Sequence, residues 1–239
     1  MKNPTELHVD ITGSAGTTAL LYAAAPGSRR AALVLAHGAG AGQRQPWLVD
    51  LARAISALGV DVLTFNFLYT EQRRKLPDRG PVLEATYSAV VAAARARVAS
   101  AAEALFIGGK SMGGRIATQI AAADRALPVA GLVLLGYPLH PPGRPEQRRD
   151  AHLPAVGRPM LFVQGSRDAF GTPPELEPLF ARIDPWPTLH VVHGGDHSFK
   201  LTTRNPQAQA AIHDDVQRTI VEWIGHVTQT SALAHRHSG

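Results

Sequence analysis

A serine between glycines, placed directly behind an apolar stretch, constrains the fold of this chain more than any other feature. The pentapeptide Gly109-Lys110-Ser111-Met112-Gly113 follows the strand-like run Leu105-Phe106-Ile107. This order predicts a sharp turn between a buried strand and a helix, in which a strained serine presents its hydroxyl. Gly109 and Gly113 would let the strand and the helix approach without side-chain collision. Because Gly-x-Ser-x-Gly is short and recurs by chance, the rest of the chain must decide whether Ser111 is a nucleophile.

Two later segments supply an acid and a base in the chain order that such a serine requires. The apolar run Met160–Gln164 ends in a turn that leaves Asp168 just past a strand. The next apolar run, Leu189–Val192, is followed by a glycine-containing loop with His197. We interpret Asp168 as the acid and His197 as the base, because the order Ser, Asp, His is the one used when the nucleophile lies on a strand-to-helix turn.

The acid has a competitor. Asp196 precedes His197 directly, but adjacent side chains seldom point at each other in the geometry that a base needs, so Asp168 is favoured. Asp168 itself has a structural alternative, the capping of a helix expected to begin near Pro173.

The chain has 11 histidines, and His197 is the one whose position suits a base. His190 lies inside an expected strand and is expected to be packed. His235 and His237 lie in a polar tail. His37 follows an expected strand, where a role in stabilising its loop by hydrogen bonds is favoured over a role as base.

A rival chemistry is present in Gly109-Lys110-Ser111, which matches the end of a phosphate-binding P-loop. That loop needs a glycine five positions earlier, and Ala104 stands there. The residues between are apolar, which leaves no loop to enclose a phosphate, so nucleotide binding is disfavoured. Two interpretations of Lys110 then stay open: a solvated side chain, or a positive charge near the mouth of a pocket.

The three motifs together resemble the α/β-hydrolases, most closely the small lid-less members related to dienelactone hydrolases. The resemblance spans roughly residues 33 to 224 and also covers His37-Gly38-Ala39-Gly40, Phe65-Asn66-Phe67 and Gly136-Tyr137-Pro138-Leu139. The dienelactone enzymes have a cysteine nucleophile, whereas this chain has no cysteine. Their particular substrate is therefore not carried over.

The resemblance implies a mechanism. Ser111 would attack an acyl carbonyl while His197 removes its proton, and Asp168 would hold the imidazole. The backbone N–H groups of Met112 and Ala39 would form the oxyanion hole. We expect a serine hydrolase that cleaves carboxylic esters through an acyl-enzyme. A thioesterase or another acyl hydrolase, and a catalytically silent binding module of the same fold, are the alternatives.

Apolar strands and helices alternate along the chain, which predicts an α/β fold. We expect a mostly parallel central sheet of about eight strands with helices on both faces. Residues 1–239 are expected to form a single α/β-hydrolase domain, with a frayed tail from about residue 228. The expected elements are an initial hairpin (7–12 and 18–24), strands at 31–36, 60–65, 105–107, 131–136, 160–164 and 189–192, and helices after Pro46, at about 81–99, after Ser111 and from Pro206.

The segment Tyr137–Arg158 is short and rich in proline, so it cannot form a helical cap domain. We therefore expect a shallow, open pocket that favours short or exposed acyl groups. The expected lining residues are Trp47, Phe67, Tyr137, Leu139 and Phe170.

The charge balance adds little to this interpretation. The net charge of +5 gathers in short loops, Arg73-Arg74-Lys75 and Arg144–Arg149, without the basic helix or interleaved aromatic residues of nucleic-acid modules. We expect a solvated rim, or an attraction for carboxylate-bearing substrates if either loop borders the site. The expected partner is a small-molecule acyl substrate, with no nucleic acid, membrane, metal or cofactor, in the cytoplasm. The oligomeric state stays open.

Overall fold

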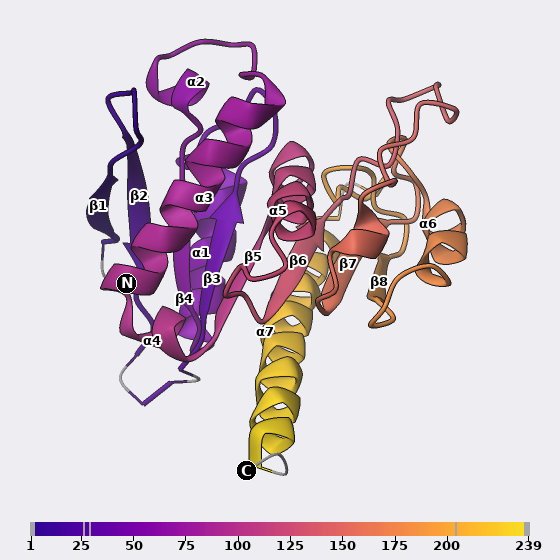
Figure 1. Cartoon of the computed structure of the whole chain (residues 1–239). Helices are drawn as coiled ribbons and strands as arrows, with labels where there is room; N and C mark the ends of the chain where they lie inside the picture. Colours follow the sequence, from indigo (N-terminus) through magenta and orange to yellow (C-terminus); the bar gives the residue numbers. More distant parts are fainter. Residues whose placement is uncertain (1–2, 26, 29, 204, 237–239) are drawn as a thin grey trace.

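The computed structural model describes residues 3–25, 27–28, 30–203 and 205–236, with side chains up to residue 230. Its centre is an eight-stranded sheet in the order β1-β2-β4-β3-β5-β6-β7-β8 (Figure 1). The pairs β1–β2 and β2–β4 are antiparallel, and the remaining neighbours are parallel. The strands are β1 (Thr5–Val9), β2 (Thr17–Tyr22), β3 (Ala32–Ala36), β4 (Asp61–Phe65), β5 (Leu105–Lys110), β6 (Gly131–Leu135), β7 (Met160–Gly165) and β8 (Thr188–Val192). The predicted fold class is confirmed.

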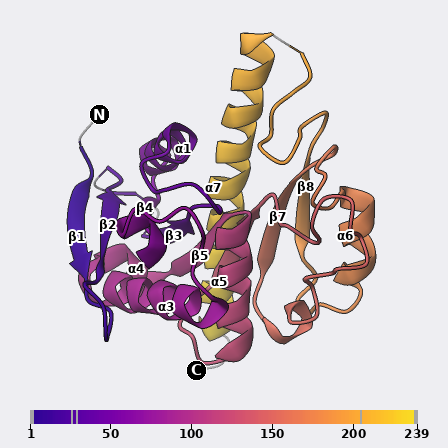
Figure 2. The same ribbon diagram turned by 90° about the horizontal axis from the view of Figure 1, so that it is seen from above.

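Helices cover both faces of the sheet, as Figure 2 shows from above. One face packs against α1 (Pro46–Ala57) and α7 (Pro206–Arg236), and the other against α3 (Gly80–Arg97), α5 (Met112–Ala123) and α6 (Pro173–Phe180). The short helices α2 (Leu68–Glu71) and α4 (Ala99–Glu103) are also present, and α4 begins where the helix expected at about 81–99 ends. No helix in the part of the chain that the structure describes is long and apolar enough to cross a membrane.

The pleat of β3 explains why two cores form. Ala32, Val34 and Ala36 pack into the core under α3 and α5. Leu33 and Leu35 point the other way, into the core under α1 and α7. All five residues of β3 are buried, as expected for a central parallel strand covered on both faces. The carboxyl ends of the parallel strands consequently meet at one edge of the sheet, where the loops with the candidate site residues lie.

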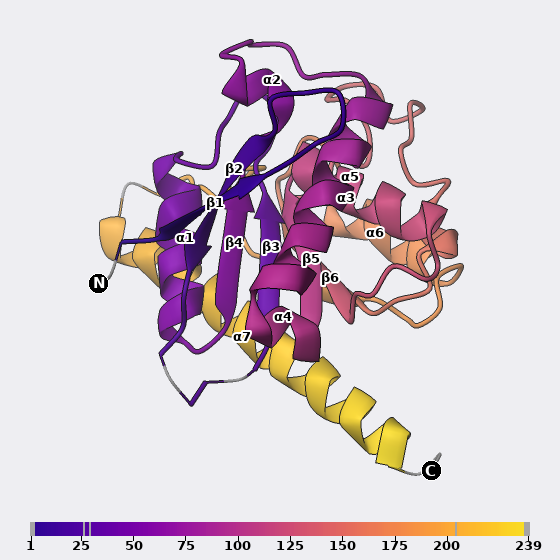
Figure 3. The ribbon, with the colours of Figure 1, turned by 60° about the vertical axis from the view of Figure 1, so that its left-hand side comes forward.

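The described residues form no cap domain, as predicted. The segment from Tyr137 to Arg158 contains one short 3₁₀ turn, η1 (Leu153–Ala155), and otherwise irregular backbone. The tail that was expected to be frayed from about residue 228 is helical as far as Arg236. Helix α7 continues to Arg236 and extends well past the sheet in Figure 3. Alanine and leucine after Ser231 favour the helical backbone, and residues 237–239 lie outside the described part.

Candidate active site

Ser111 lies on a tight turn between β5 and α5. Its backbone has φ 51° and ψ −115°, a left-handed region that costs a non-glycine residue free energy and marks functional turns. The Ser111 N–H still donates to Leu135 O of β6 at 2.9 Å, so the sheet holds the turn up to the serine itself. A Cβ at Gly113 would lie 2.6 Å from Ala36 O, and one at Gly109 would also collide with that oxygen. Both glycines are therefore required by the close approach of β3.

The imidazole of His197 bridges the serine and a carboxylate. Its Nε2 lies 2.9 Å from Ser111 Oγ, and its Nδ1 lies 2.8 Å from Asp168 Oδ2. A carboxylate only accepts, so Nδ1 has the proton and Nε2 is free to accept the serine hydroxyl. The Phe170 ring packs on the imidazole at a centroid distance of 4.2 Å, which restricts the ring to this orientation.

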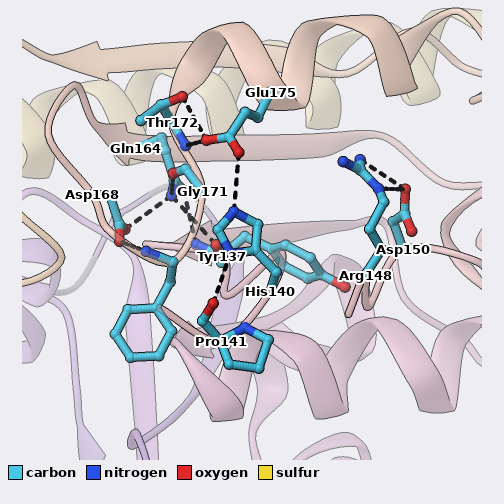
Figure 4. Close-up of polar contacts among 11 residues, drawn as sticks. Tyr137, His140, Pro141, Arg148, Asp150, Gln164, Asp168, Gly171, Thr172 and Glu175 are labelled. Atoms are coloured by element: carbon cyan, nitrogen blue, oxygen red, sulfur yellow. Dashed lines mark hydrogen bonds and ion pairs between the residues drawn. The ribbon is translucent and has the colours of Figure 1, made fainter. Parts of the chain in front are cut away.

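Asp168 is held by more than the histidine. Its side chain is fully buried. Oδ1 accepts the Phe170 N–H at 2.8 Å, and Oδ2 accepts Nε2–H of Gln164 at 2.9 Å. Gln164 is itself fixed, because it accepts the Tyr137 N–H at 2.8 Å and donates to Gly171 O at 2.7 Å (Figure 4). Gln164 was not singled out in the sequence, where it reads as the last residue of an apolar strand.

Asp196 has a different task from Asp168. Its Oδ1 accepts the backbone N–H of Ser198 at 2.7 Å and of Lys200 at 2.9 Å. Asp196 therefore shapes the loop that presents His197. Helix α6 is capped by Thr172, so Asp168 is not its cap.

The histidines that the sequence offered as alternatives to His197 have other partners or lie outside the described part. His37 is buried, its Nδ1–H donates to Gly38 O at 2.8 Å, and its Nε2 accepts the Phe67 N–H at 3.2 Å. Burial lowers its pKa, consistent with a neutral ring that fixes its loop. His190 Nε2 lies 3.0 Å from Asp215 Oδ2 of α7. The side chain of His235 and all of His237 lie outside the described part.

The two expected oxyanion donors lie beside Ser111. Met112 is the first residue of α5, where backbone N–H groups have no partner within the helix and the helix dipole is positive. Ala39 follows Gly38, whose Cα lies against the elbow so closely that a Cβ there would be 3.7 Å from Ser111 Cβ. Ala39, Met112 and Ser111 all line one cavity.

Lys110 is not a solvated side chain. Its Nζ has almost no accessible surface and no hydrogen-bond partner among the described residues, and it lies 5.5 Å from the centre of the Phe199 ring. Burial lowers the pKa of Lys110 to about 8, against the opposing influence of Asp168 and then Asp196. Of the two interpretations of Lys110 from the sequence, the structure agrees with a charge near the pocket, since Lys110 lines the cavity.

The cavity at Ser111 has a volume of about 1010 Å³, at the upper end of the range for small-molecule sites. Trp47 and Phe170 line it as expected. Phe67, Tyr137 and Leu139 do not: all three are fully buried in the core under α3 and α5. Phe67 continues the alternation of Leu63 and Phe65 of β4, which face the same core. The walls of the cavity come from other segments instead.

Those other segments include residues that the sequence did not single out. The start of α3 contributes Gly80 and Leu83, and α7 contributes His213 and Val216. Arg115, one turn after the nucleophile on α5, and Arg149, from the proline-rich segment, also line the cavity. Spacing from Ser111 could have indicated Arg115, because residues four apart share a helix face. Arg149 is brought in by tertiary contacts alone.

Within the described residues, no group of three or more His, Cys, Asp and Glu side chains is placed to hold a metal ion.

The comparisons with known proteins agree with this architecture. A family model described as an alpha/beta hydrolase domain matches residues 29–225. Among solved structures, a lid-less α/β serine hydrolase from Xanthomonas campestris matches at 19% identity and TM-score 0.69, over 93% of this chain and 96% of that chain. A dienelactone hydrolase from Anabaena variabilis matches at 20% identity and TM-score 0.70, over 94% and 99%. Est1E from Butyrivibrio proteoclasticus, with ferulic acid bound, matches at 15% identity and TM-score 0.70, over 90% and 98%. At these identities the structural likeness concerns the fold.

Proposed function

Since the chain belongs to the α/β-hydrolase family, we propose that it is a serine hydrolase that cleaves carboxylic esters through an acyl-enzyme on Ser111. One observation supports this most: Ser111 Oγ, the His197 ring and Asp168 form an unbroken hydrogen-bonded line, with contacts of 2.9 and 2.8 Å. The strained backbone of Ser111 adds to it, since such strain persists where the surrounding structure enforces it.

The proposed reaction has two halves. In the first, Ser111 Oγ bonds to the carbonyl carbon as its proton moves to His197 Nε2, and the Met112 and Ala39 N–H groups stabilise the oxyanion. The tetrahedral intermediate then breaks its bond to the alcohol oxygen, which takes the proton from Nε2. In the second half, water gives a proton to Nε2, attacks the acyl carbon and releases the acid, and Ser111 regains its proton. Asp168 stays ionised and stabilises the imidazolium in both halves.

The substrate is a small acyl compound, with no nucleic acid, membrane or cofactor required. Esters are favoured, because two structural neighbours are described as a dienelactone hydrolase and as a ferulic-acid complex of Est1E. Thioesters would react by the same line of groups. Without a cap domain, acyl groups that are short or exposed on larger molecules suit the site better than long fatty chains, which need an enclosing apolar surface.

Labelling with a fluorophosphonate tests the proposal, because this reagent forms a covalent adduct with an activated serine. We expect an adduct on Ser111 in the wild type and none in Ser111→Ala or His197→Ala, with all three proteins folded by circular dichroism. Absence of an adduct on folded wild type would favour a catalytically silent binding module instead.

A further inference from the structure

The cavity has two chemically different walls, one on each side of Ser111. The first, here named the apolar wall, lies over the face of the sheet that α1 and α7 cover. Its side chains are aromatic or aliphatic, and the rings of Trp47 and Phe199 lie 6.1 Å apart. The wall consists of Trp47, Leu51, Phe199, Leu201 and Val216.

The second wall, here named the cationic wall, consists of Arg115 and Arg149. It lies over the opposite face, because Arg115 is on α5 and Arg149 O accepts the hydroxyl of Tyr137, a residue of the core under α3 and α5. Both arginines are half-buried. The two guanidinium groups are close enough for Arg149 to lower the pKa of Arg115, after the larger effect of burial.

Neither arginine of this wall has an ion-pair partner within the described residues. Among these residues the Arg115 side chain makes one hydrogen bond, from Nη1 to Gln119 Oε1 at 3.3 Å. Glu84 raises the pKa of Arg115 electrostatically, but it is too far away to form an ion pair with it. The neighbouring Arg148, by contrast, reaches Asp150 Oδ2 at 3.0 Å.

Neither of the two carboxylates that line the described cavity, Asp50 and Asp78, forms an ion pair with Arg115 or Arg149. Asp78 is already used, since it accepts the Tyr69 N–H at 3.0 Å and pairs with Arg74. Asp50 is exposed on α1, on the side of the apolar wall. Two half-buried guanidinium groups that repel each other are costly unless an anion neutralises them, and their planar forks match the two oxygens of a carboxylate.

We propose that the cavity binds an ester in which an apolar, ring-sized group and a carboxylate lie on opposite sides of the scissile bond. The apolar group would pack against the apolar wall, the carboxylate would pair with Arg115 and Arg149, and the ester carbonyl would reach Ser111 between them. This inference rests on the proposed ester hydrolysis and narrows its substrate class.

Two matched pairs of substrates test the inference, one for each orientation of the ester. Monophenyl adipate has its carboxylate on the acyl side and is compared with its neutral methyl ester. The anion of 4-(benzoyloxy)butanoic acid has its carboxylate on the alcohol side and its ring on the acyl side, and is compared with its methyl ester. We expect the carboxylate to raise kcat/KM at least tenfold in one of the two pairs.

Variants locate the cause of that preference. Arg115→Gln and Arg149→Gln should each lower the ratio of anionic to neutral kcat/KM by about 10- to 100-fold, the range for losing a hydrogen bond to a charged group. Arg144→Gln is the matched control, because Arg144 lies exposed on the same segment outside the cavity lining, and it should leave the ratio unchanged. A ratio near one in wild type for both pairs, or an unchanged ratio in both arginine variants, would overturn the inference.

A binding measurement separates this inference from the proposed function. The amide analogue of the preferred ester, adipic acid monoanilide for the first pair or 4-(benzoylamino)butanoic acid for the second, replaces the ester by an amide, and its affinity for Ser111→Ala is measured by calorimetry. We expect at least tenfold weaker binding when Arg115→Gln and Arg149→Gln are added, and no detectable binding to either protein would contradict the inference. Hydrolysis of the neutral esters without carboxylate preference refutes the substrate class alone, whereas failure of fluorophosphonate labelling refutes the serine hydrolase.

Discussion

Asp168 and Lys110, two buried charged groups near His197, differ in how the protein satisfies them. The Asp168 carboxylate accepts hydrogen bonds from His197, Gln164 and the Phe170 backbone. The Lys110 ammonium, equally shielded from water, has no hydrogen-bond partner within the described residues. A buried charge with full hydrogen bonding is stable where it stands, whereas an unpaired one costs free energy. The contrast indicates a preorganised acid on one side of the histidine and a costly positive charge beside the nucleophile.

The largest expected effect comes from removing a member of the hydrogen-bonded line of Ser111, His197 and Asp168. Ser111→Ala or His197→Ala should lower kcat on a reactive ester by about a millionfold, and Asp168→Asn by about ten-thousandfold, as in other triads. The asparagine offers an N–H where Nδ1–H needs an acceptor, so it would leave the imidazole in the wrong tautomer. Steady-state kinetics with active-site titration give these values. A variant that retains most of the activity would show that its residue has another role.

Removing the positive charge of the buried Lys110 ammonium should stabilise the protein. Lys110→Met keeps the length of the side chain without the ammonium, and we expect the free energy of unfolding to rise by about 3 kcal/mol at pH 7. This figure follows from the lowering of the Lys110 pKa from 10.5 to about 8. Urea denaturation of both proteins measures it. Lys200→Met is the control, because Lys200 also lines the cavity but is exposed, and its effect should be small.

The gain from Lys110→Met should depend on pH. Below pH 8 the amine is protonated in both the folded and the unfolded chain, so the burial penalty is fully present in the wild type. Between pH 8 and 10.5 the folded amine is neutral while the unfolded amine still binds a proton, so the wild type gains stability and the difference shrinks. A gain that stays constant from pH 7 to pH 10.5, or a loss of stability at pH 7, would contradict the assignment of a buried, unpaired ammonium.

Gln164→Leu tests whether the hydrogen bonds around Asp168 serve the reaction. The leucine fills the buried site but removes the donor to Asp168 and the acceptor for the Tyr137 N–H. We expect kcat to fall by about tenfold or more with little change in KM, and the free energy of unfolding to fall by about 1–3 kcal/mol. The acidic limb of the pH profile of kcat/KM should shift as well, which a loss of stability alone would not produce. An unaltered profile with a normal kcat would limit Gln164 to a structural role.

The smallest effect is expected at Asp196, and its size tests whether Asp168 rather than Asp196 is the acid. Asp196→Ala removes the acceptor for the N–H groups of Ser198 and Lys200. We expect a loss of about 1 kcal/mol in the free energy of unfolding, as for other local caps, and a decrease in kcat/KM far below that of Asp168→Asn. A ten-thousandfold loss in Asp196→Ala would reverse the assignment of the acid.

Much of the fold could be predicted because local sequence determines it. The apolar runs of β3, β5 and β6 read as covered strands, and Pro46 and Pro206 mark the starts of α1 and α7. The positions of Ser111, Asp168 and His197 followed from strand ends and chain order, and the structure brings these side chains into contact.

The walls of the cavity could not be predicted in the same way. An aromatic residue in an apolar stretch has the same sequence pattern in a core and in a pocket, so the sequence predicts Phe67 and Tyr137 in the lining although they are core residues. Lys110 lies between Gly109 and Ser111 along the chain, yet Phe199, from a loop far away in sequence, covers its amine. The role of Arg149 as a lining residue depends on how the proline-rich segment folds back over α5, which no local pattern encodes.

The central claim is that Ser111 receives the acyl group of the substrate, and a trapped acyl-enzyme tests it most directly. Wild-type protein is mixed with excess p-nitrophenyl butyrate, quenched in acid within the first turnover, digested and measured by mass spectrometry. We predict a burst of p-nitrophenol equal to the enzyme concentration and a butyryl group on the peptide with Ser111, both absent in Ser111→Ala. Hydrolysis by the wild type that proceeds without an acyl group on Ser111, or that persists at the same rate in Ser111→Ala, would contradict the account.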